Sequence, residues 1–330
     1  MTNIGQGNSV SGDRAGQLLL IGTACGAISA IGYSIANIFL RQLVDCDPIW
    51  VSTIKTVPTI LLALPWLLLR RRAGLPESNH HRSLITVLVI GLCASLLGNV
   101  AFQWSLGVVG LTVAVPIIFG AMLVSSPLLS QAVLGEVVSK RTFLAMGILI
   151  LSILLLSARI DPIEGQQPGT GTTLLAAVLL LCVAGIAYTA LGVGIRYGLD
   201  HGLSMPTTLC IISISGFLFL GALSLQGIGW SEMLATSPED LTSMLLAGVF
   251  NAVAFLALIK AIHLTSVTYV NLINASQVAI AAISGVLLFH EKLTTLMMIG
   301  VILTIAGLML MQRPSAEDGD KLQETGPGPG

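Results

Sequence analysis

A polar stripe around a single lysine is the part of this sequence best suited to binding chemistry. Ser52, Lys55, Thr56 and Thr59 stand at i, i+3, i+4 and i+7 within a long apolar stretch, so a helix would place them on one face. A charge buried in lipid costs at least about 2.5 kcal/mol, which favours a water-filled space beside this face. There the Lys55 ammonium would attract an anionic group such as a carboxylate. The alternative is that Lys55 extends to the outer headgroups.

Amide and phenol side chains interrupt other apolar stretches and could orient a small amphipathic solute, with apolar walls supplying contact. The alternative is that the amides join neighbouring helices. Tyr33 is expected in the outer half of its stretch and Tyr188 in the inner half, so the two could serve as outer and inner gates. Their alternative role is that of interfacial anchors. With Lys55, the candidate substrate-binding residues are Tyr33, Asn37, Asn99, Gln103, Tyr188, Asn251, Asn271, Asn274 and Gln277.

The sequence lacks the residues that enzymes need. No aspartate or glutamate stands deep in an apolar stretch, and no HExxH, Walker or GxSxG motif occurs. None of the five cysteines forms a CxxC pair, so they are interpreted as small packing residues. We therefore expect no catalytic residue, no metal site and no cofactor.

Composition identifies the elements that must hold these side chains. Of 330 residues, 54% are hydrophobic and 9% charged, whereas an average soluble domain has about 25% charged residues. This excludes an ordinary water-soluble enzyme and a disordered chain. A net charge of −1 gives no basic surface for nucleic acid. The expected partners are a small-molecule solute and the lipid bilayer, and a monomer and a homodimer both remain open.

The long apolar stretches predict an all-α membrane protein with ten transmembrane helices, because a bilayer core needs about 20 apolar residues per helix. The expected spans lie near 18–40, 48–69, 84–106, 111–134, 142–158, 172–195, 205–225, 241–262, 267–289 and 293–311. Residues 1–17 form an N-terminal segment and residues 313–330 a polar tail, which we expect to be disordered.

Basic residues predict the orientation. With the N-terminus inside, eleven lysines and arginines fall on the cytoplasmic side and three outside, and Lys55 is the remaining one of fifteen. We therefore expect a multi-pass protein of the plasma or inner membrane with both termini cytoplasmic.

The two halves of the chain resemble each other at a fixed offset. Glu136 and Glu291 are 155 residues apart, and the same offset pairs Tyr33 with Tyr188 and Arg41 with Arg196. The link after the second span carries four arginines, whereas the matching link of the second half carries only acidic charges. The halves, 18–158 and 172–312, are therefore predicted to be inverted five-helix repeats. We expect both glutamates to cap the turn into the following helix.

With two five-helix halves and a glutamate between the fourth and fifth helices of each, the sequence resembles the EamA-type carriers of the drug/metabolite transporter superfamily over about residues 18–312. The first half carries Leu134, Gly135 and Glu136 in the familiar form, whereas His290 stands where the second half usually has glycine. Lys55 occupies the place of a basic residue that members commonly hold early in the second helix. The resemblance implies two inverted five-helix repeats around a central cavity, and members move amino acids, other metabolites and drugs, often outward.

The expected function is a secondary transporter that exports small organic metabolites, such as amino acids or drug-like amphipathic solutes. It would work by alternating access around a cavity between the repeats. The alternative is a channel-like protein or a non-transporting membrane scaffold. A channel would favour rings of charge or a carbonyl filter, and the sequence shows neither.

Overall fold

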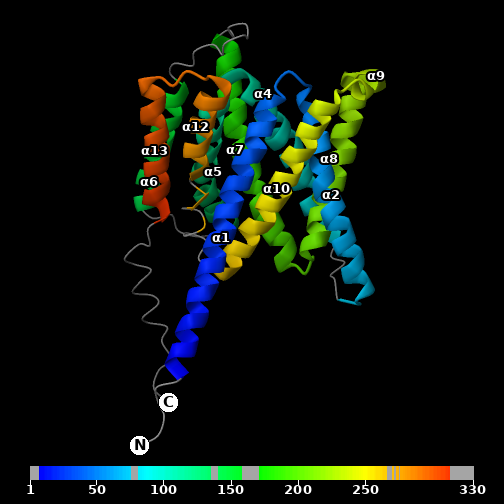
Figure 1. Ribbon diagram of the computed structural model, residues 1–330, viewed down its shortest axis with the longest axis vertical. Helices are drawn as coiled ribbons and strands as arrows, with labels where there is room; N and C mark the ends of the chain where they lie inside the picture. Colours follow the sequence, from blue (N-terminus) through cyan, green and yellow to red (C-terminus); the bar gives the residue numbers. More distant parts are fainter. Residues whose placement is uncertain are drawn as a thin grey trace, which may run out of the picture.

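The structure is a computed structural model that describes residues 7–75, 81–134, 140–157, 171–265, 270, 273–274 and 276–312. Within these residues every regular element is a helix (Figure 1). The helices are α1 (Gly7–Gln42), α2 (Pro48–Arg72), α3 (His81–Cys93), η1 (Ala94–Val100), α4 (Ala101–Val109), α5 (Leu111–Leu134), α6 (Lys140–Ser157), α7 (Gly171–Asp200), α8 (Met205–Gly227), α9 (Gly229–Leu234), α10 (Pro238–Leu264), α12 (Ser276–Phe289) and α13 (Thr295–Gln312).

Several of these helices are long and apolar enough to cross a membrane. Among the described residues seven meet this requirement, and three shorter apolar helices accompany them. Leu20, Leu61 and Leu287 on the outside of the bundle are 72%, 68% and 69% exposed, whereas Ser29 and Thr53 inside it are 0% exposed. Apolar side chains face outward and small polar ones inward, as lipid requires. The chain is a multi-pass membrane protein.

Local sequence signals determine where these helices begin and end. Asp47 caps α2 by accepting a hydrogen bond from the backbone N–H of Trp50 at 2.8 Å, and Pro48 follows it in the first helical position. Ser237 caps α10 in the same way, accepting from the N–H of Asp240 at 3.0 Å. Gly110 ends α4 with a φ of 78°, a conformation that glycine adopts without steric cost.

The helices pack in pairs that repeat between the two halves of the chain. α1 packs along α10. α7 is the equivalent of α1 in the second half, and it packs along α3, η1 and α4. α2 contacts α8, and α6 contacts α13, so each of these pairs joins equivalent helices of the two halves. This is the contact pattern of two similar units related by a two-fold axis.

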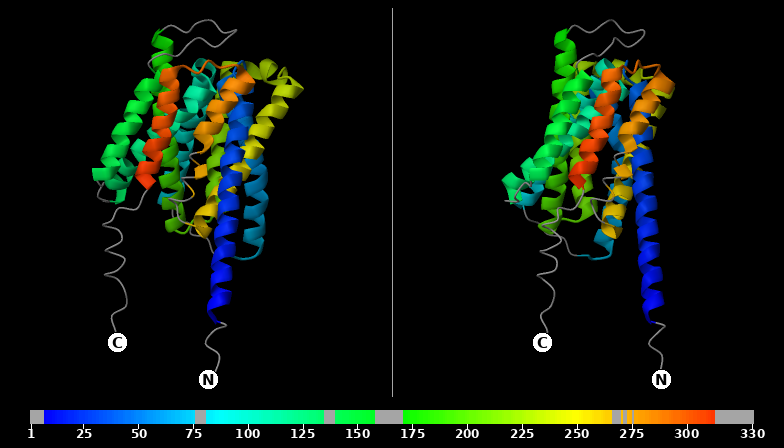
Figure 2. Two further views of the ribbon diagram at one scale, coloured as in Figure 1. Left: turned by 60° about the vertical axis from the view of Figure 1, so that its left-hand side comes forward. Right: turned by 90° about the vertical axis from the view of Figure 1, so that its left-hand side faces the viewer.

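Equivalent helices run in opposite directions. We call the end of the bundle where α1 ends and α2 and α5 begin the upper end, and the opposite one the lower end, as drawn in Figure 1. α1 runs toward the upper end, whereas α7 starts there and runs down. α13 also ends at the lower end, where α1 begins (Figures 1 and 2).

The described helices depart from the expected spans in three places. α1 begins at Gly7, well before residue 18, because extending a helix that is already formed costs little. The third span is continuous from His81 to Val109 but contains the π-helical turn η1. The short helix α9 lies in the link between α8 and α10, outside the expected spans. Part of the expected 267–289 span and the expected tail lie outside the described residues.

Candidate functional site

Lys55 is buried within the bundle and donates a hydrogen bond to an amide. Its side chain is 7% exposed, and Nζ donates a hydrogen bond of 2.8 Å to Oδ1 of Asn99 on η1. The ion pairs of Arg41 with Glu291 and of Arg196 with Asp200 do not involve Lys55. A buried ammonium with an uncharged partner is able to accept an anionic group.

Tyr188 of α7 completes this cluster from the other half of the chain. Its hydroxyl donates to the same Asn99 Oδ1 at 2.9 Å, so two donors from different repeats converge on one oxygen. The tyrosine ring lies where Gly98 has no side chain, because a Cβ on Gly98 would come within 2.9 Å of the ring. We call Lys55, Asn99 and Tyr188 the central cluster.

Asn99 lies in an irregular part of its helix. η1 has seven residues, Ala94–Val100, in π-helical geometry within an otherwise α-helical span. π-helical turns often occur at functional sites, because the extra residue turns side chains away from the α-helical register. Here the turn places Asn99 between Lys55 and Tyr188.

Tyr33 lies on α1 and is half-buried. Its expected placement in the outer half, with Tyr188 in the inner half, stays a prediction. Asn37, one turn along α1 from Tyr33, is also half-buried.

A second polar cluster lies between α1 and α12. Asn274 Oδ1 accepts hydrogen bonds from Ser29 at 3.2 Å and from Gln277 at 2.7 Å, and all three side chains are buried. The Asn274 amide thus connects α1 to the segment before α12, whereas Gln277 bonds within its own segment. Whether these amides also contact a solute stays a prediction. Asn271 lies outside the described residues.

Asn251 takes a different position from these amides. It is half-buried on α10 next to Phe250, whose ring stacks on Phe39 of α1 with centroids 6.0 Å apart. The stacked pair lies in the contact between α1 and α10.

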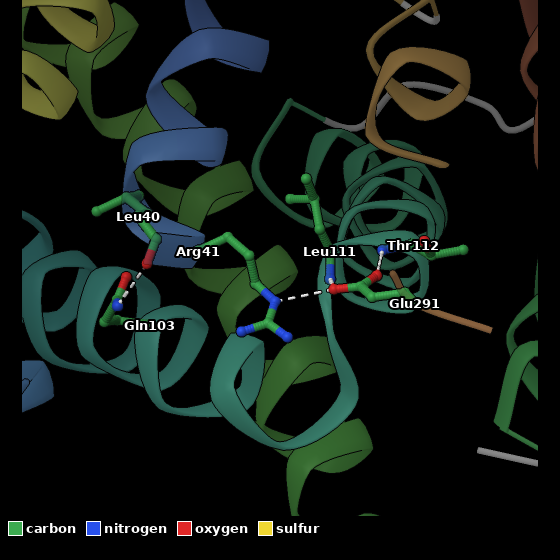
Figure 3. Close-up of polar contacts among 6 residues, drawn as sticks. All are labelled: Leu40, Arg41, Gln103, Leu111, Thr112 and Glu291. Carbon is green, nitrogen blue, oxygen red and sulfur yellow. Dashed lines mark hydrogen bonds and ion pairs between the residues drawn. The ribbon is translucent and has the colours of Figure 1, made fainter. Parts of the chain in front are cut away.

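An ion pair lies at the upper end of the bundle. Nε of Arg41, at the end of α1, is 2.8 Å from Oε1 of Glu291, and the two side chains are 6% and 5% exposed (Figure 3). The Glu291 carboxylate also accepts the backbone N–H groups of Leu111 and Thr112, both at 2.8 Å. The guanidinium lies over the Phe289 ring, 5.3 Å from its centroid.

Glu291 therefore caps a helix, but not the expected one. The sequence predicted that it would meet the N-terminus of α13, the next helix in the chain. Its carboxylate instead meets the N-terminus of α5, where Leu111 and Thr112 present unpaired N–H groups. The turn that contains His290, with a φ of 53°, directs Glu291 back into the bundle. Glu136, the repeat mate of Glu291, lies outside the described residues.

Gln103 belongs to this upper end and not to the central cluster. Its Nε2 donates to the carbonyl oxygens of Leu40 at 2.9 Å and Leu43 at 3.3 Å, where α1 ends (Figure 3). The side chain is 2% exposed. Gln103 thus adds a second donor to two carbonyl groups that also accept the backbone N–H groups of Leu43 and Cys46 in the turn after α1.

Sequence reasoning missed two contacts. The ion pair between Arg41 and Glu291 was not expected, although the offset relations of these residues to Arg196 and Glu136 were recognised. The link between Asn99 and Tyr188 had no local signal, because the two residues come from different repeats. The described residues contain no group of three or more histidine, cysteine, aspartate or glutamate side chains that could hold a metal ion.

Comparison with known proteins gives three similarities. A model of the EamA-like transporter family matches residues 20–158 and again residues 175–313. A protein of Lactobacillus johnsonii named "Putative sugar uptake protein" is 26% identical over 237 residues, covering 69% of this chain and 77% of that protein. A chain of known crystal structure superposes with a TM-score of 0.54 at 11% identity, covering 92% of this chain and 99% of that one. The last similarity shows a shared fold.

Proposed function

This chain belongs to the EamA-like transporter family, and from that premise we propose that it is a secondary carrier for a small organic solute. The two repeats would rock about a site between them and expose it to each side in turn. The proposed topology has ten spans in two inverted halves with both termini cytoplasmic. The opposite directions of α1 and α7 support the inversion.

One observation supports the proposed site most strongly. Lys55 from the first repeat and Tyr188 from the second both donate to Asn99 Oδ1, at 2.8 and 2.9 Å. The amide oxygen occupies the position that an oxygen of a bound solute would take. A solute that binds both donors would bridge the two repeats and would sense their relative movement, as alternating access requires.

We propose that the solute carries a carboxylate, as an amino acid or an amphipathic organic anion does. A carboxylate oxygen is a stronger acceptor than an amide oxygen, and it would neutralise Lys55. It can therefore displace Asn99 from both donors. Tyr33, Asn37 and Asn251 would contact the rest of the solute, and the proposed direction is export.

The relative from Lactobacillus johnsonii supports a second candidate. Its name describes sugar uptake, and a sugar hydroxyl could also accept from Lys55 and Tyr188. A neutral sugar would leave the Lys55 charge uncompensated, which makes the carboxylate the better match for the central cluster.

Flux into proteoliposomes tests these proposals. Purified protein would be supplied with radiolabelled amino acids, the corresponding amino acid amides and hexoses at increasing concentrations. We expect saturable transport of at least one carboxylate-bearing solute. Lys55→Ala should lower its kcat/KM by about ten- to a hundredfold, the equivalent of one charged hydrogen bond.

Lys260→Ala is the matched control, because Lys260 is an exposed lysine on α10. It should transport like the wild type. If only hexoses gave saturable flux, the proposal of a carboxylate-bearing solute would be wrong and a sugar would be the substrate. Absence of saturable flux for every solute would contradict the carrier.

A further inference from the structure

We propose that Arg41 and Glu291 form a reversible lock, which holds the upper end of the bundle closed and breaks when the carrier opens at that end. This inference rests on the alternating access proposed above. It assigns a conformational role to two charged residues that do not contact the central cluster.

The lock connects three elements from both repeats. Arg41 is the next-to-last residue of α1, and Glu291 lies in the turn between α12 and α13. The same carboxylate binds the first two N–H groups of α5 at 2.8 Å each. Opening the upper end requires α1 and α5 of the first repeat to move away from α12 of the second. That movement must separate Glu291 from Arg41, from α5, or from both.

The surroundings of Glu291 fit a carboxylate closely. A Cβ on Gly110 would come within 2.6 Å of its carboxyl carbon, and a Cβ on Gly285 within 2.5 Å of Oε2. The Thr112 hydroxyl beside it is buried and has no hydrogen-bond partner among the described residues. Two glycines therefore provide the space that the carboxylate occupies, and the closed position is well defined.

At the opposite end of the bundle the described residues show a different arrangement, and Glu136, the repeat mate of Glu291, lies outside them. Arg196, the repeat mate of Arg41, lies near the lower end of α7, where its side chain is 74% exposed. Its ion pair in the described chain is with Asp200, one turn further along the same helix, at 3.9 Å. Among the described residues, the upper end thus holds a buried ion pair, whereas the equivalent arginine at the lower end is exposed. An alternating carrier requires such a difference between its two ends.

Water can replace the bonds of the lock when it opens. A buried ion pair is held in place mainly because leaving one partner unpaired in an apolar site is costly. When the upper end opens, both groups and the α5 N-terminus become hydrated together. The lock can therefore break without leaving an isolated buried charge.

Cysteine accessibility tests the lock without knowledge of the solute. Thr112→Cys is the reporter, because Thr112 is 2% exposed and lies directly behind Glu291. The five native cysteines would be replaced by serine or alanine, and a membrane-impermeant maleimide would be added separately to each side of sealed vesicles. Glu291→Gln and Arg41→Gln each remove one charge, and Arg196→Gln removes the exposed repeat mate as a control.

We expect Glu291→Gln and Arg41→Gln to raise the labelling rate from the Arg41 side by about tenfold or more, because an unpaired buried charge shifts the equilibrium toward the open state. Arg196→Gln should not raise it. Unchanged labelling in both variants would overturn the lock. Failure of both variants to fold would overturn it too, since a lock must tolerate its open state. Altered labelling without any solute flux would retain the lock and reject the proposed transport.

Discussion

At the scale of single residues, the partner of Lys55 determines what the central cluster can bind. An ammonium that is 7% exposed and bound to the Asn99 amide oxygen has one good neutral partner and no charge compensation from the two described ion pairs. This arrangement is stable enough to fold yet favours exchange for a stronger acceptor. The same reasoning makes Asn99 the residue that sets how readily a solute enters.

Asn99→Asp should introduce a carboxylate that competes with the solute for Lys55 and Tyr188. The new carboxylate would form an ion pair with Lys55 and hold both donors, so we expect the half-saturating concentration of a carboxylate solute to rise by about tenfold or more. Asn99→Ser, which removes the amide without adding charge, should leave Lys55 available. Concentration-dependent flux in proteoliposomes measures both variants. Equal half-saturation in the Asp variant and the wild type would contradict the displacement of Asn99.

Cys46, in the turn between α1 and α2, should alkylate slowly at neutral pH. Burial raises the pKa of its thiol, and the nearby carboxylates of Asp240, Asp45 and Asp47 raise it further. A raised pKa leaves less thiolate at a given pH, so the maleimide reaction should accelerate only at a more alkaline pH than for an ordinary cysteine. Asp240→Asn should shift this profile toward lower pH. A profile that does not move would show that Asp240 does not act on the thiol.

At the scale of elements, glycine contacts determine how closely the helices approach. Gly285 of α12 faces Glu291 and the Thr112 hydroxyl so closely that a methyl group would overlap both. Gly221 of α8 has ordinary room, since a Cβ there would lie 3.6 Å from Thr53 Cγ2. The two positions therefore form a matched pair for testing the packing around the capping carboxylate.

Gly285→Ala should destabilise the protein by about 1–3 kcal/mol, because the added methyl group forces Glu291 away from the start of α5. Gly221→Ala should have little effect or a slightly stabilising one. Thermal unfolding of the purified variants in one detergent provides the comparison. A Gly285→Ala protein as stable as Gly221→Ala would mean that the carboxylate moves without cost.

The sequence predicted elements better than contacts. The α2 span and the stripe with Lys55 followed from local composition and helical spacing. The π-helical turn at Asn99, and the hydrogen bond of Asn99 with Tyr188 of the other repeat, had no such local signal. Glu291 was correctly expected to cap a helix. The expected helix, α13, was wrong, because the turn at His290 directs the carboxylate to the N-terminus of α5. Local patterns specify helices, and tertiary packing selects their partners.

At the scale of the whole molecule, the two halves act as units of opposite orientation. Equivalent helices form equivalent contacts, and α1 and α7 run in opposite directions (Figure 1). The central cluster draws residues from both halves, whereas the Arg41–Glu291 pair lies at the upper end. Movement of one half against the other would therefore change the site and the lock together.

Reporter fusions test the proposed topology. Gly74 follows α2 at the lower end and Gly229 begins α9 at the upper end (Figure 1). A cytoplasm-specific reporter should be active when inserted at Gly74 and inactive at Gly229, because the arginines that end α2 favour the cytoplasmic side. Activity at both sites would contradict the inversion of the two halves.

Exchange across the membrane tests the central claim most directly. Proteoliposomes preloaded with an unlabelled carboxylate solute, identified by its saturable flux, would receive a trace of the labelled solute outside. A carrier with one alternating site should accumulate the label transiently above its equilibrium level, and Lys55→Ala should abolish this overshoot. Label that only equilibrates, equally in the wild type and in Lys55→Ala, would contradict both the alternating site and the role of the central cluster.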